Sequence, residues 1–232
     1  MNLNEILQET VYFGAALSIF FYWIGTLIQK KWKLSILNPL LICLVLVILF
    51  LKIFHIDYET YDAGAKYITY FLTPATVCLA LPLYRQMQIL KKNLPAILIS
   101  ILLGCLAHFF VVWGIAALFH LNDALFLSFL PKSVTTPIAL GISDKIGGLQ
   151  EITVIGVTFA GLMGAILGPA LLKLFGIRNP AAQGLALGSA SHAVGTSKAV
   201  ELGEIQAAMS SLAIVVTGIL TVIICPLLLS VL

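Results

Sequence analysis

The chain has 232 residues, of which 60% are hydrophobic and only 10% are charged, and its formal net charge is +3. This composition excludes an ordinary soluble domain and predicts an all-α, polytopic integral membrane protein. The lysines and arginines lie at the ends of apolar runs, so they bear on orientation in the bilayer and give no reason to expect a nucleic-acid partner.

Apolar runs predict about 6–8 transmembrane spans in one domain, residues 1–232. The runs lie near residues 11–29, 36–54, 67–84, 94–119, 122–148, 152–174, 180–203 and 206–231. Lys30 and Lys31 follow the first run and place its end in the cytoplasm. The first ten residues lack the features of a signal peptide, so we expect a multi-pass protein of the bacterial plasma membrane. Residues 1–120 would act as a scaffold and residues 121–232 would carry the functional motifs.

The third run, 67–84, is interrupted by Pro74 and Pro82, and Thr73 and Thr76 there are candidate ligands. A kink in the scaffold explains the same prolines. His108 is a lone histidine in the fourth run, and core packing is its expected role. The cysteines (Cys43, Cys78, Cys105 and Cys225) all lie in apolar runs and are expected to be small buried residues.

The fifth run contains the most unusual segment of the chain, PKSVTTPIAL at residues 131–140. Two prolines free backbone groups that need partners at membrane depth, and a lysine there is costly enough to suggest a function. The candidate binding residues are Lys132, Ser133, Thr135 and Thr136, with Lys132 as the point charge for a carboxylate. In the alternative, Lys132 extends to the interface and the hydroxyls bond their own helix.

A second polar segment, residues 189–198, lies in the seventh run. Its candidate site residues are Ser189, Ser191, His192 and Thr196. Ser189, His192 and Thr196 would share one face if the segment is helical, and the flanking Gly188 and Gly195 allow it to unwind or to pack closely. Lys198 and Glu201 are spaced to form a structural or gating ion pair.

The topology of these two segments has two interpretations. If 122–148 and 180–203 enter the membrane and return, Lys173 and Arg178 fall in the cytoplasm and the chain contains a candidate inverted repeat. If they cross fully, the positive-inside rule is weakly obeyed. Paired carboxylates, a nucleophile motif, a phosphate loop and metal-ligand spacing are all missing from the sequence, so we predict neither an enzyme nor a cofactor.

Three ordered motifs resemble the LrgB/CidB family over nearly the whole chain. They are PATVCLALPLY at 74–84, PKSVTTPIA at 131–139 and GSASHAVGT at 188–196. The resemblance implies two roles: a holin- or antiholin-like modulator of murein hydrolase export and cell lysis, or a carrier of small carboxylates such as glycolate, lactate and pyruvate. It also implies a small LrgA/CidA-type membrane partner, to which this chain could be an accessory subunit.

Broken helices and polar ligands suit a carrier better than a pore-former. The sequence therefore favours transport of small monocarboxylates, with lysis modulation as the alternative. A homodimer is the expected oligomeric state.

Overall fold

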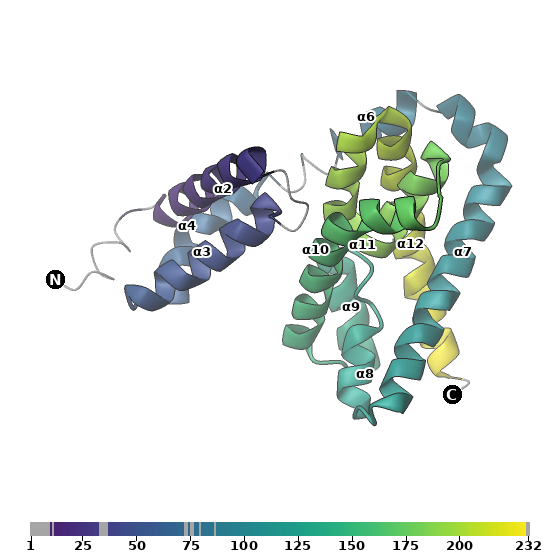
Figure 1. Ribbon diagram of the computed structural model, residues 1–232. Helices are drawn as coiled ribbons and strands as arrows, with labels where there is room; N and C mark the ends of the chain where they lie inside the picture. Colours follow the sequence, from purple (N-terminus) through teal and green to yellow (C-terminus); the bar gives the residue numbers. More distant parts are fainter. Residues whose placement is uncertain are drawn as a thin grey trace. The chain divides into compact units, whose positions relative to one another are not determined.

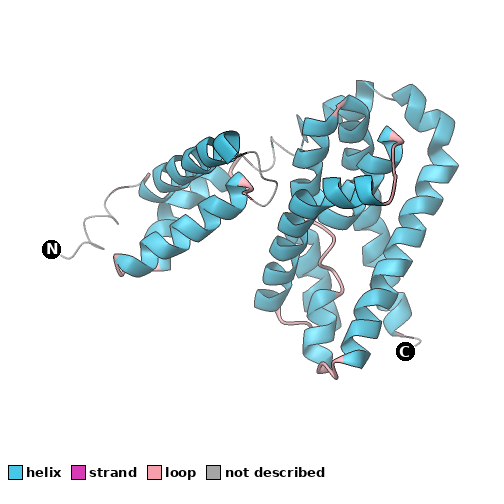
Figure 2. Ribbon diagram, viewed as in Figure 1, coloured by secondary structure: helices cyan, strands magenta, loops and turns pink. Residues whose placement is uncertain are grey.

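The computed structural model describes residue 10 and residues 12–32, 37–71, 74, 77–78, 80–85 and 87–230. Their regular secondary structure is helical (Figure 2), which confirms the all-α class. The chain divides into two compact units, Met1–Cys78 and Leu79–Leu232. The assignment of residues 1–232 to one functional domain stays a prediction.

In the described part of the first unit, three helices pack together through glycines. They are α2 (Phe13–Trp32), α3 (Pro39–Ile53) and α4 (Tyr58–Thr69). α3 begins at Pro39, because Asn38 Oδ1 accepts a hydrogen bond from the Leu40 amide at 2.8 Å. Proline suits the first turn of a helix because it has no backbone N–H that would lack a partner there. Gly14 of α2 lies directly against the Tyr61 carbonyl of α4, so any side chain at this position would prevent the contact.

The second unit is a bundle around α12. Its helices are α6 (Ala80–Arg85), α7 (Met87–Leu118), α8 (Asp123–Phe129), α9 (Thr136–Ile146), α10 (Gln150–Leu174), α11 (Pro180–Leu202) and α12 (Glu204–Leu229). α12 packs against α6, α7, α9 and α11, while α10 packs against α8, α9 and α11. In Figure 1, α8 and α9 lie near the C-terminal end of α7.

Small residues bring α11 close to both of its neighbours. Gly184 and Gly188 of α11 lie against the backbone of Gln206 and Ser210 in α12, and Gly168 of α10 lies against the Leu187 side chain. These glycines therefore serve packing inside the chain.

Three helices within the described ranges are long and apolar enough to cross a bilayer. They are Asn93–Leu118, Gln150–Leu174 and Glu204–Leu229, and Pro39–Ile53 is a shorter apolar helix. The run at 67–84 is not one continuous helix, since Tyr70 and Phe71 form a turn before Pro74, which has no backbone donor. The expectation of four buried cysteines is correct only for Cys105 and Cys225; Cys43 is half-buried and Cys78 is exposed.

Candidate functional site

The first polar segment forms a non-helical link, residues 130–135, between α8 and α9. These helices have 7 and 11 residues, or about 10 and 16 Å at 1.5 Å per residue, well short of a bilayer core of about 30 Å. Asp123 at the start of α8 and Ile146 at the end of α9 line one cavity together with Leu229. The segment therefore returns to the end of the unit at which it entered.

Buried hydrogen bonds fix this return. Ser128 Oγ accepts a hydrogen bond from the Leu149 amide at 2.7 Å, and Thr153 Oγ1 donates to the Ser128 carbonyl at 3.1 Å. Gly147 ends α9 with φ of 85°, a left-handed conformation that glycine adopts without strain. α8 and α9 thus form a hairpin attached to the start of α10.

The second polar segment breaks α11 between its two halves. Ser191 and His192 have non-helical backbone angles, and His192 has φ of 42°. The imidazole donates a hydrogen bond from Nε2 to the Val157 carbonyl of α10 at 3.0 Å. After the break the chain returns, because Gln206 at the start of α12 donates from Nε2 to Gln183 Oε1 near the start of α11 at 3.1 Å.

A cavity of about 500 Å³ lies between α7, α11, α12 and the first break. Its polar lining comes from three helices and the break: Ser100, His108, Lys132, Ser133, Ser189, Thr217 and Thr221. Within the described residues, no carboxylate lies within ion-pair distance of Lys132. Thr217 Oγ1 is buried and has no hydrogen-bond partner in that part of the chain, although the Cys105 thiol, a weak donor, is its neighbour.

A second cavity, about 340 Å³ in volume, lies between α10 and α11. Its lining is mostly apolar, and it shares Lys132, Ala186 and Ala190 with the first cavity. Lys132 therefore lies where the two cavities meet. Ala186 and Ala190 of α11 line both cavities as well.

The candidate residues from the sequence fall into separate groups. Lys132, Ser133 and Ser189 meet in the first cavity, and Ser191 lines the second. Thr135 caps α9 and Thr136 begins it; neither lines these cavities. Thr73 and Thr76 lie outside the described residues. A role in binding stays a prediction for all of them.

His192 and Thr196 do not share a polar face with Ser189, because the helix is interrupted between them. His192 contacts Val157, and Thr196 Oγ1 donates to the His192 carbonyl at 2.9 Å and lies 2.7 Å from Ser210 Oγ. Both are buried structural contacts. The condition for a common helical face, a continuous helix through residues 189–196, is therefore not met.

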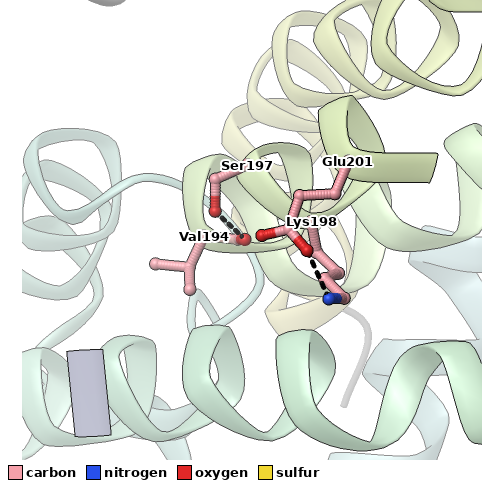
Figure 3. A network of polar contacts seen from close by, with 4 residues as sticks. All are labelled: Val194, Ser197, Lys198 and Glu201. Carbon is pink, nitrogen blue, oxygen red and sulfur yellow. Dashed lines mark hydrogen bonds and ion pairs between the residues drawn. The ribbon is translucent and has the colours of Figure 1, made fainter. Parts of the chain in front are cut away.

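The structure also bears on two other predictions from the sequence, the Lys198–Glu201 ion pair and the role of His108. Lys198 and Glu201 form the expected ion pair on the second half of α11, beside a hydrogen bond from Ser197 Oγ to the Val194 carbonyl at 2.7 Å (Figure 3). His108 lines the first cavity, which corrects its assignment to core packing. The only signal for it in the sequence was an ionisable side chain inside an apolar span.

Comparison with known proteins covers the whole of this region. A sequence model of the LrgB-like family matches residues 18–231. Similar proteins from Bacillus mycoides, Bacillus cereus and Bacillus anthracis are each called antiholin-like protein LrgB. Each is 43% identical over 218 residues, which cover 94% of this chain and 95% of the relative. No solved structure matches the chain significantly.

Proposed function

Because the chain belongs to the LrgB-like family, we propose that it is an antiholin-like membrane protein that modulates murein hydrolase export and cell lysis. The name shared by relatives that match 94% of the chain carries this proposal. The chain is a membrane protein with apolar helices long enough to span, as such a role requires.

Lysis measurements test this role in cells. The chain would be expressed in a Bacillus strain whose own LrgB-like proteins have been deleted. The control strain would express an unrelated polytopic protein in the same amount in the membrane. We expect lower murein hydrolase activity in the medium and slower detergent-induced lysis with this chain. Equal lysis and equal hydrolase activity in the two strains would contradict the proposal.

The first cavity supports a second candidate, a carrier of small monocarboxylates. Lys132 carries this candidate, because a lysine held at a cavity, with no carboxylate of a described residue beside it, favours an anionic ligand. The hydroxyls of Ser133, Ser189 and Thr217 line the same space and can donate to an anion. A volume of about 500 Å³ accommodates a small carboxylate with water around it.

A carrier also needs a place for the two hairpins in the membrane. We propose that both are re-entrant and enter from opposite sides. The α8–α9 hairpin returns beside Leu229 at the C-terminal end of α12, and α11 returns beside Gln206 at its N-terminal end. This arrangement agrees with an inverted repeat in which discontinuous helices meet near the midplane.

Uptake into liposomes separates the candidates. Liposomes holding only the purified chain would receive labelled pyruvate or glycolate outside and a trapped dye inside. Saturable uptake that other monocarboxylates inhibit, with the dye retained, is the result expected of a carrier. Dye release without saturable uptake would contradict it and favour a pore. Uptake that needs a co-purified LrgA/CidA-type protein would make this chain an accessory subunit. The expected homodimer would be tested separately, by cross-linking in the same liposomes.

A further inference from the structure

His108 connects α7 to the first break by two contacts. Its Nε2 lies 2.9 Å from the carbonyl oxygen of Leu130, and its Nδ1 lies 3.4 Å from Nζ of Lys132. The Leu130 side chain is fully buried, so this end of the break is fixed against the core. The imidazole therefore contacts both the backbone of the break and its only charged side chain.

The two contacts together determine which nitrogen of the neutral imidazole carries the hydrogen. An ammonium only donates hydrogen bonds and a carbonyl only accepts them. A neutral imidazole satisfies both partners only when its hydrogen is on Nε2, which donates to Leu130, while Nδ1 accepts from Lys132. The opposite tautomer would place a hydrogen against Lys132 and leave the Leu130 carbonyl without this donor.

The contact with His108 fixes the direction in which the Lys132 side chain extends. A methyl group at Gly156 of α10 would lie 3.5 Å from Lys132 Cβ, whereas Nζ lies beside His108 of α7. The side chain therefore extends from α10 toward α7, past the junction of the two cavities. Without the imidazole acceptor, Nζ would have no hydrogen-bond partner in the described part of the chain.

We infer that His108, as the neutral imidazole with hydrogen on Nε2, is a positioning residue that presents the Lys132 ammonium to an anion in the first cavity. This inference rests on the proposed carrier function. The contact between Nδ1 and Nζ is long for a hydrogen bond, so an arriving carboxylate can replace it. His108 holds Nζ in place before the anion binds and does not itself carry the charge.

Two amide substitutions distinguish the two roles that His108 could have. One role is to position Lys132 through Nδ1, and the other is only to attach the first break to α7 through the hydrogen bond from Nε2 to Leu130. His108→Asn retains an acceptor near the position of Nδ1, and His108→Gln retains a donor near the position of Nε2. If His108 positions Lys132, His108→Asn should bind labelled pyruvate within about threefold of the unchanged chain. His108→Gln and His108→Ala should bind it about tenfold more weakly, the effect of one hydrogen bond to a charged group. KM should follow the binding constants while Vmax changes less.

Direct binding to the purified chain and uptake into liposomes are both measured. His120→Asn, in the turn that follows α7 and lining a different cavity, is the matched control and should leave binding unchanged. Wild-type affinity in His108→Gln with loss in His108→Asn would mean attachment only and overturn the inference. Equal affinity in all three His108 variants would overturn it as well. If the unchanged chain fails to bind pyruvate, the carrier function itself is contradicted.

A spectroscopic measurement tests the inference without any substrate. The chain has four histidines, so nitrogen-15 spectra of labelled histidine in liposomes can be assigned by comparison with His108→Asn. We expect His108 to carry hydrogen on Nε2 only, and its Nδ1 signal to shift in Lys132→Met. Hydrogen on Nδ1, or an unchanged signal in Lys132→Met, would overturn the inference even where uptake is absent.

Discussion

The imidazole of His192 donates a hydrogen bond from Nε2 to the carbonyl of Val157 at 3.0 Å and so joins the break in α11 to α10. His192 has φ of 42° and ψ of −134°, a non-helical conformation at positive φ that residues with a side chain rarely adopt. The residue therefore combines a rare backbone conformation with the side-chain bond that stabilises it. Its role in this structure is to maintain the break.

Replacing His192 with alanine should destabilise the chain. The change removes the hydrogen bond to the Val157 carbonyl, so we expect a loss of about 1–3 kcal/mol in the free energy of unfolding. Thermal unfolding in detergent measures it. His120→Ala is the control, since His120 also has positive φ and its side chain makes no hydrogen bond to a described residue. An equal loss in both variants would assign the effect to the backbone alone.

Gly164 should not tolerate a side chain. A methyl group there would overlap Cβ and Oγ of Ser191 in the second break, so Gly164→Ala must displace that break. We expect a loss of about 1–3 kcal/mol, as for overpacked cores. Gly114→Ala in α7, where no atom lies within 4 Å, should leave the melting temperature unchanged or raise it slightly. If Gly164→Ala and Gly114→Ala have the same melting temperature, the close contact between α10 and the second break is wrong.

Ser128→Ala should loosen the attachment of the α8–α9 hairpin to α10. Ser128 is fully buried, and the substitution leaves the Leu149 amide without its acceptor, at a cost of about 1–3 kcal/mol. Ser100→Ala is the control, because among the described residues Ser100 Oγ bonds only the Ala96 carbonyl of its own helix. Hydrogen exchange at Leu149 should be faster in Ser128→Ala alone. Unchanged exchange there would contradict the attachment.

Lys132→Met should weaken pyruvate binding about tenfold or more while leaving the fold intact. Methionine retains much of the aliphatic length that lies along Gly156 and removes the charge that an anion needs. Lys198→Met removes a lysine that already pairs with Glu201 and should bind pyruvate normally. Equal binding by both variants would move the anion site away from Lys132.

The sequence was sufficient to locate both breaks, because prolines at 131 and 137 and the polar run at 189–198 are local signals. It also identified Lys132, Ser133 and Ser189, which the structure brings into one cavity. These residues stand out by type in an apolar background.

The remaining site residues depend on contacts between distant segments. His108 contacts groups more than 20 residues away, at Leu130 and Lys132, and no local pattern indicates such a pairing. Helical spacing places Ser189, His192 and Thr196 on one face only if the helix is continuous, and the non-helical residues Ser191 and His192 interrupt it. The proposed scaffold half, residues 1–120, also contributes to the cavity through α7.

Three glycines of α10 lie against the two breaks. Gly156 lies against Lys132 of the first break and Phe129 at the end of α8, and Gly161 and Gly164 lie against His192 and Ser191 of the second. The rise of α10 therefore sets the separation of these contacts along its axis, about 12 Å between Gly156 and Gly164 at 1.5 Å per residue. One residue inserted between Gly156 and Gly161 would rotate one set by about 100° relative to the other. The register of a single helix thus determines how the two breaks are oriented relative to each other.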